Sequence, residues 1–228
     1  MKILSIDSKL MQSFRLLFDY VGVNIVFVLC CIPIFTIGAA QSGLYTAIRA
    51  MQRNQPWLRL FFNAFKQSFK STTLVWIVCL PVIYLFSCMI YLLVTVEIPG
   101  STPAVVCACI VMGFVMCIAA TASLLHSRFD FTAKQLFRNS IVMLLAAPLQ
   151  IIIGSAAIWA PVLIFFLVPW LFLDLFFWLF CIYFSIAAVL FARLMRYPIG
   201  RLADEIPERP ESYFVREAKR RAGKLKEE

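Results

Sequence analysis

The chain has 228 residues, of which 62% are apolar, 15% aromatic and only 14% charged, and its mean hydropathy is +0.88. Soluble domains carry roughly 45–50% apolar and about 25% charged residues. This composition excludes a soluble globular fold, a disordered chain and a secreted disulfide scaffold. The net charge of +9 is a signal of orientation in a membrane rather than of a polyanionic partner.

Five long segments without Asp, Glu, Lys or Arg contain 138 of the 228 residues. They are 20–48, 71–96, 98–127, 139–173 and 175–192. A helix needs about 20 apolar residues to cross a bilayer, and a β-barrel would show short alternating segments instead. The sequence therefore predicts an all-α, polytopic integral membrane bundle of five to six transmembrane helices.

The predicted membrane helical domain covers 1–192, and a basic cytoplasmic tail covers 193–228. We expect spans at about 16–32, 36–52, 72–95, 104–125, 141–160 and 171–193. The segment 16–52 is either one long span or two short helices bent at Pro33. Two helices place every Lys and Arg on one side, which agrees with the cytoplasmic preference of basic loops. Both termini are then cytoplasmic.

A possible internal repeat relates two parts of the chain. Residues 66–72 (KQSFKST) resemble residues 134–140 (KQLFRNS) at an offset of 68, and Phe61 matches Phe129. Each unit is a small-residue helix entering the cytoplasm, a basic aromatic linker and a helix leaving it. Internal repeats are common in membrane transport folds, but seven matched positions also arise by chance.

The linker 57–70 predicts an amphipathic helix at the inner membrane interface. Aromatic residues recur every four positions on one face, and basic residues lie on the other: Trp57, Phe61, Phe65 and Phe69 against Arg59, Lys66 and Lys70. Such a basic face attracts anionic lipid by about 1 kcal/mol per charge. The helix is either a structural collar or a docking surface for a cytoplasmic partner, and 129–140 would be its second copy.

Small residues are concentrated in Thr36–Gly43. The pairs Gly38/Ser42 and Ala39/Gly43 lie four positions apart, a spacing that lets helix backbones approach closely. The segment serves either tight packing or a substrate-facing surface.

Three polar residues inside apolar stretches are candidates for function: Asn24, Gln150 and Asp174. An intramembrane acid is a functional candidate by default, although near the outer interface Asp174 can simply reach water. Asn24 and Gln150 can instead form helix–helix hydrogen bonds. If the three converge, they indicate a small transporter or channel with a polar path.

No motif indicates catalysis. The chain lacks a phosphate-binding loop, a zinc-protease helix and a nucleophile elbow. All eight cysteines lie in apolar stretches and there is a single His, so a metal site is disfavoured. We expect no enzyme activity, no catalytic or metal-binding residue, no cofactor and no nucleic-acid partner; the expected partner is the lipid bilayer.

Two runs resemble a known family. Residues 29–40 (LCCIPIFTIGAA), followed by Leu44-Tyr45, and residues 61–70 (FFNAFKQSFK) resemble the YesL-like family of bacterial membrane proteins, domain of unknown function 624. The second half of the chain is similar only in hydropathy and in the repeated basic motif.

The resemblance implies a multi-pass protein of the bacterial plasma membrane with no established activity. Members of the family are often encoded near carbohydrate ABC importers. It therefore implies a non-enzymatic accessory component of carbohydrate uptake, with importer subunits as partners. No catalytic or binding residue can be carried over.

Overall fold

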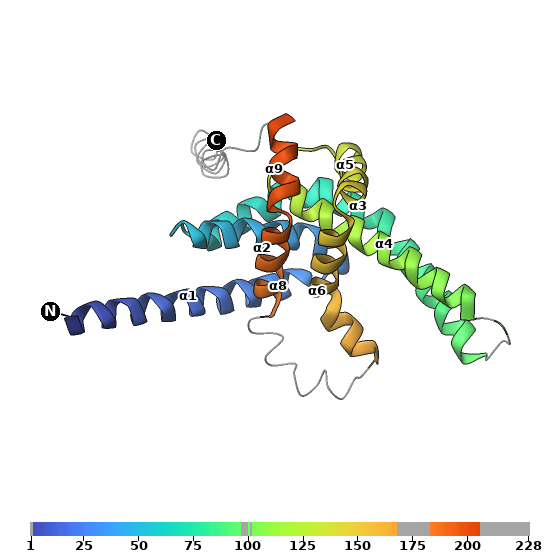
Figure 1. The fold of residues 1–228 in the computed structure, drawn as a ribbon, viewed down its shortest axis with the longest axis horizontal. Helices are drawn as coiled ribbons and strands as arrows, with labels where there is room; N and C mark the ends of the chain where they lie inside the picture. Colours follow the sequence, from blue (N-terminus) through green and yellow to red (C-terminus); the bar gives the residue numbers. More distant parts are fainter. Residues whose placement is uncertain (1, 97–99, 101, 168–182, 206–228) are drawn as a thin grey trace, which may run out of the picture.

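The structure is a computed structural model that describes residues 2–96, 100, 102–167 and 183–205. Every regular element in this part of the chain is a helix, which confirms the predicted all-α class (Figure 1). The elements are α1 (Lys2–Cys31), the 3-10 helix η1 (Ile34–Thr36), α2 (Ile37–Gln52), α3 (Trp57–Thr95), α4 (Thr102–His126), α5 (Ala133–Ala146), α6 (Pro148–Leu167), α8 (Phe184–Leu194) and α9 (Arg196–Glu205).

The helix α2 lies at the centre of the bundle. It packs against α1, α3, α4 and α8, and its residues from Gly38 to Ile48 are all buried. The small residues explain this position. A Cβ at Gly38 would lie 2.1 Å from the Trp76 ring of α3, and Ser42 Oγ donates a hydrogen bond to the Ser123 carbonyl of α4 at 2.8 Å. At these positions the segment serves close packing.

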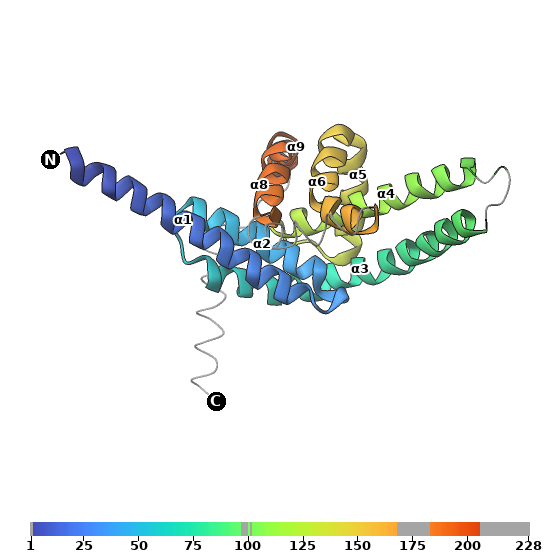
Figure 2. The same cartoon turned by 90° about the horizontal axis from the view of Figure 1, so that it is seen from below.

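The chain reverses between α1 and α2 at the predicted break. Pro33 has an extended backbone, with φ −75° and ψ 112°, and the Thr36 amide donates to its carbonyl at 2.9 Å. Proline has no amide hydrogen to continue a helical ladder. As a result α2 turns back along α1 (Figure 2), and the two helices pack together.

The predicted number of spans is not confirmed. Within the described residues, three helices are long and apolar enough to cross a membrane: Phe14–Cys31, Trp57–Leu93 and Thr102–His126. The number rises to four if α5 and α6 form one bent span. The expected span 36–52 corresponds to α2, which at 16 residues is about 24 Å long. Most of the expected span 171–193, and the tail beyond 205, lie outside the described residues.

The structure divides the expected span 141–160 between α5 and α6, and a single bent span across both helices stays a prediction. The chain direction bends by 113° between the two helices. Ala147 between them has φ −141° and ψ 58°, and the ring of the following Pro148 disfavours a helical conformation at that residue.

The linker 57–70 is corrected, because it is not a separate helix. It forms the first turns of α3, which runs for 39 residues without interruption. The hydroxyl of Thr72, beyond the linker, donates to the Ser68 carbonyl one turn earlier at 2.7 Å. This polar side chain is therefore hydrogen-bonded within the helix. The distal part of α3 pairs with α4 in a hairpin that projects from the rest of the bundle (Figures 1 and 2).

The internal repeat stays a prediction. Its matched residues Phe61 and Phe129 are both fully buried. The linkers differ, however. The first continues straight into α3, whereas α5 begins after a loop with a capping box at Thr132 and ends at the bend before α6.

Candidate anion-binding pocket on the basic face

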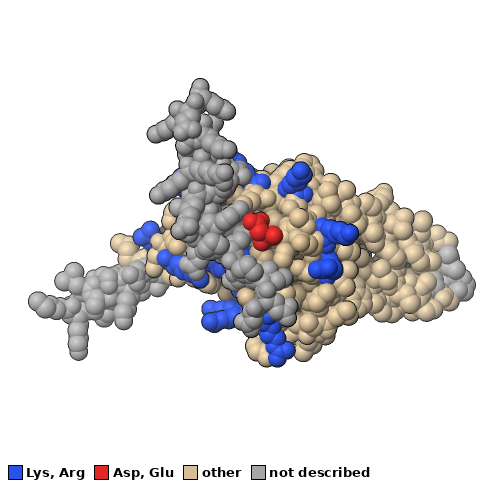
Figure 3. Space-filling view, turned by 90° about the horizontal axis from the view of Figure 1, so that it is seen from above, with Lys and Arg blue, Asp and Glu red and all other residues tan. Residues whose placement is uncertain are grey.

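Charge is distributed unevenly over the surface. Lys and Arg gather over the central bundle on the face in Figure 3, whereas the visible surface of the projecting hairpin is free of them. Residues 71–95 and 102–126 contain no Asp, Glu, Lys or Arg. Large apolar side chains of this hairpin are exposed, among them Tyr84, Leu85 and Phe114. An uncharged, apolar exterior of this kind suits contact with lipid.

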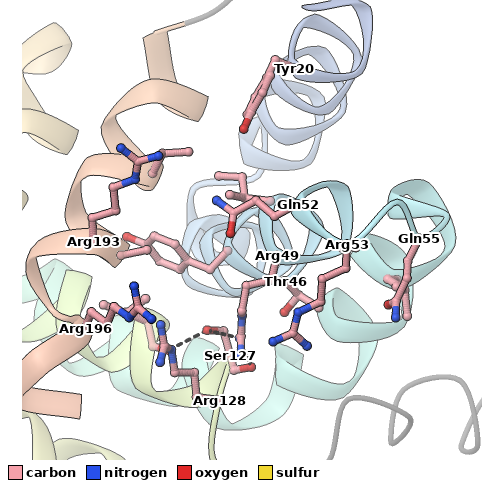
Figure 4. A pocket seen from close by; sticks show the side chains of 17 residues that line it. Tyr20, Thr46, Arg49, Gln52, Arg53, Gln55, Ser127, Arg128, Arg193 and Arg196 are labelled. Atoms are coloured by element: carbon pink, nitrogen blue, oxygen red, sulfur yellow. Dashed lines mark hydrogen bonds between the residues drawn. The ribbon is translucent and has the colours of Figure 1, made fainter. Parts of the chain in front are cut away.

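A pocket of about 570 Å³ lies among the basic residues, between the C-terminal half of α2 and the junction of α8 with α9 (Figure 4). Five arginines line it: Arg49, Arg53, Arg128, Arg193 and Arg196. No Asp or Glu is among its lining residues in the described part of the chain.

Three separate parts of the chain bring the arginines together. Arg49 and Arg53 lie four positions apart at the C-terminal end of α2, where the helix dipole favours cations. Arg128 follows the end of α4, and Arg193 and Arg196 flank the α8–α9 junction. The pocket therefore depends on the tertiary packing of α2, α4 and α8.

The Arg49 side chain is held in place by the turn after α4. Its Nη2 donates to the Ser127 carbonyl and to Ser127 Oγ, the latter at 3.0 Å. The Ser127 hydroxyl in turn donates to the Leu124 carbonyl at 2.6 Å. Because Arg49 is half-buried and Ser127 fully buried, the guanidinium is fixed at the pocket wall.

A buried hydroxyl group also belongs to this pocket. Tyr45 lines the pocket and is 2% exposed. Its hydroxyl oxygen has no hydrogen-bond partner among the described residues. Leaving such a group unpaired costs about 1–3 kcal/mol, and the adjoining pocket has room for a partner that would avoid this cost.

The predicted intramembrane residues do not meet in this pocket. Asn24 of α1 is fully buried, and its Oδ1 accepts a hydrogen bond from Ser185 of α8 at 2.9 Å. Gln150 of α6 is half-buried and does not line the pocket. Asp174 lies outside the described residues. Asn24 thus forms the helix–helix hydrogen bond expected as one of its alternatives, and the polar path stays a prediction.

The aromatic face of 57–70 turns only partly toward the protein, because Phe69 at its far end is 37% exposed. Phe61 is fully buried, and its ring lies 3.0 Å from where a Cβ on Gly43 of α2 would stand. Phe65 stacks on Phe61 with ring centroids 6.4 Å apart. Phe69 meets Phe35 edge-on at 6.4 Å.

The remaining predicted linker residues lie nearer the surface. Trp57 is half-buried, and its Nε1 donates to Asp19 Oδ1 of α1 at 2.9 Å. Arg59, Lys66 and Lys70 are exposed. The basic side of this helix is therefore accessible, whereas Phe61 is not available to a partner.

The pocket arginines were not among the candidates that the sequence indicated. Their spacing on α2 and around the α8–α9 junction is visible in the sequence, but it fits cytoplasmic helix ends equally well. Only the fold shows that residues as far apart as Arg49 and Arg196 line one cavity.

Residues 20–89 match the family described as "Protein of unknown function, DUF624". This confirms the resemblance to the YesL-like family over the segment that contains α2 and two of the pocket arginines, Arg49 and Arg53. No curated protein and no solved structure matches the chain. The match and the apolar helices together indicate a membrane protein of unknown function.

Proposed function

We propose that this protein, whose residues 20–89 match DUF624, is a non-enzymatic accessory component of a carbohydrate uptake system in the bacterial plasma membrane. In this role its basic face holds subunits of an ABC importer on the cytoplasmic side. The association with an importer is inferred from the family resemblance. The surface that would bind the importer is inferred from the structure of α3.

The main observation in support of docking is that the first turns of α3 have a buried aromatic side and an exposed basic side. The buried Phe61 attaches this segment to α2, while Lys66 and Lys70 are exposed. A firmly packed helix with exposed cations is pre-organised to meet an acidic protein surface, because little conformational entropy is lost on binding.

The packing of the bundle also agrees better with a partner-binding role than with a transport path. Asn24 Oδ1 accepts a hydrogen bond from Ser185, and Gly38 is covered by the Trp76 ring. A transport path along α1 and α2 would need these groups to face water.

The test is co-purification with the importer. The tagged full chain is solubilised in mild detergent from cells that express the importer, and recovery of the importer's membrane subunits is measured. The Lys66→Gln/Lys70→Gln variant should lower their recovery severalfold. The control Arg15→Gln/Arg201→Gln removes two other exposed charges and should leave recovery unchanged.

Unchanged recovery with Lys66→Gln/Lys70→Gln, or an equal loss with the control, would contradict docking through α3. Failure to recover importer subunits at all, together with normal sugar uptake in a deletion strain, would overturn the proposed function.

A further inference from the structure

We propose that the arginine-lined pocket is a binding site for a phosphate monoester, carried either by a lipid head group or by a small soluble molecule. This inference goes beyond the accessory role, and either can hold without the other. It rests on the charge, the geometry and one unsatisfied hydroxyl of the pocket.

The charge of the pocket selects an anion. Five guanidinium groups and no carboxylate are found among its described lining residues. A concave surface lined by one sign of charge concentrates counter-ions. The planar fork of arginine matches phosphate and carboxylate oxygens through paired hydrogen bonds. Five converging guanidinium groups suit the three oxygens and the double charge of a phosphate monoester.

Two arginines are poised to bind. Arg193 and Arg196 are exposed at the α8–α9 junction, and in the described part of the chain neither guanidinium group makes a hydrogen bond or ion pair. Figure 4 shows them across the pocket from Arg49 and Arg53 on α2, with Arg128 beside Ser127. A phosphate between these walls would bridge elements that are far apart in the sequence.

The buried Tyr45 hydroxyl supplies the second observation. It lines the same pocket, is shielded from the surface and has no partner among the described residues. A phosphate oxygen is an acceptor that would satisfy its proton. A purely electrostatic patch of surface arginines would not require such a donor in its interior.

The size and remaining lining of the pocket indicate that the phosphate carries a polar organic group. A volume of about 570 Å³ falls in the range of small-molecule sites, roughly 300–1,000 Å³. Gln52 and Gln55 also line it, and their amides can donate to and accept from hydroxyl groups. Phosphatidic acid and glycerol 3-phosphate both present a phosphate monoester on a glycerol backbone: the lipid, from a membrane, offers ester carbonyls to these amides, and the soluble ester offers free hydroxyls.

The experiment has two arms, both with the full chain. In one, glycerol 3-phosphate is titrated calorimetrically into the protein in neutral detergent. In the other, the protein is placed in phosphatidylcholine nanodiscs with or without phosphatidic acid, and the lipid retained on purification is measured by native mass spectrometry.

Three variants are compared in both arms. Arg193→Gln/Arg196→Gln removes the two exposed pocket cations and should weaken binding about tenfold or more, given the strength of charged hydrogen bonds. Tyr45→Phe keeps the buried ring and should weaken binding severalfold. The matched control Arg59→Gln/Arg138→Gln removes two exposed arginines that do not line the pocket, and should change affinity less than twofold.

Saturable binding in the first arm with this pattern supports the proposal and identifies a soluble ester as the ligand. Binding in the second arm alone, with the same pattern, supports it and identifies a lipid head group. Absence of binding in both arms overturns the proposal. So does an equal loss in the Arg59→Gln/Arg138→Gln control, which would mean general attraction to a basic surface.

Discussion

Arg49 and Ser127, 78 positions apart in the chain, are joined by a hydrogen bond from Arg49 Nη2 to Ser127 Oγ at 3.0 Å. The bond fixes the C-terminal end of α2 to the turn that follows α4. Both residues line the pocket, so the same contact that stabilises the bundle also sets the position of one pocket wall.

Replacing Arg49 should therefore affect stability as well as ligand binding. Arg49→Gln removes a charged donor from the buried Ser127 and should destabilise the fold by about 1.5–3 kcal/mol. Thermal unfolding in detergent measures this. Arg59→Gln, at an exposed position near the start of α3, should shift the melting temperature little. Equal shifts for both variants would show that the Arg49–Ser127 contact is not a structural one.

Gly38 should be intolerant of even a methyl group. A Cβ there would stand 2.1 Å from Cδ1 of Trp76, and Trp76 is 1% exposed and cannot withdraw. Overpacking of this kind costs about 1–3 kcal/mol. Gly38→Ala should therefore lower the unfolding temperature. Gly113→Ala is the control, because nothing lies within 4 Å of its Cβ position; it should be neutral or slightly stabilising. The reverse order would contradict the packing of α2 on α3.

Binding of glycerol 3-phosphate should strengthen between pH 5 and pH 7.5. The second ionisation of a phosphate monoester has a pKa of about 6, so the dianion that the arginines prefer is formed across this range. Arginine stays protonated throughout. Calorimetric titrations at several pH values measure the trend. An affinity that is flat or falls as pH rises would show that the dianion is not the species bound.

The hydrogen bond between Asn24 and Ser185 should be structural. Ser185→Ala leaves the fully buried Asn24 Oδ1 without this donor, at a cost of about 1–3 kcal/mol. Circular dichroism during thermal unfolding should detect the loss, while phosphate binding should be unaffected because neither residue lines the pocket. A variant as stable as the unmodified protein would return Asn24 to the candidates for a polar path.

Helix positions were predictable where the sequence carries strong local signals. Pro33 separates α1 from α2, and the expected 36–52 agrees closely with the observed Ile37–Gln52. The bend at Pro148 is sharper than a kink, because the backbone at the preceding residue leaves the helical region entirely. The sequence did not predict that α3 is continuous. An amphipathic segment followed by an apolar segment is compatible with two short helices and with one long helix.

The pocket could not be predicted from the sequence, for a different physical reason. Each arginine occupies a position that a membrane protein commonly gives to a cytoplasmic cation. Their convergence depends on the packing of α8 against α2, which includes the contact between the Tyr45 and Phe191 rings at 6.2 Å. The positions of these arginines in the sequence therefore do not indicate that the side chains come together in the fold.

The proposed function requires that the basic face, with the pocket in it, lies in the cytoplasm while the tip of the α3–α4 hairpin reaches the other side. The direct measurement is labelling with a membrane-impermeant maleimide in a background without the native cysteines. Gln52→Cys at the pocket and Arg201→Cys on α9 should react only after the cells are permeabilised, and Gly100→Cys at the hairpin tip should react in intact cells. Labelling of Gln52→Cys or Arg201→Cys from outside intact cells would contradict the account.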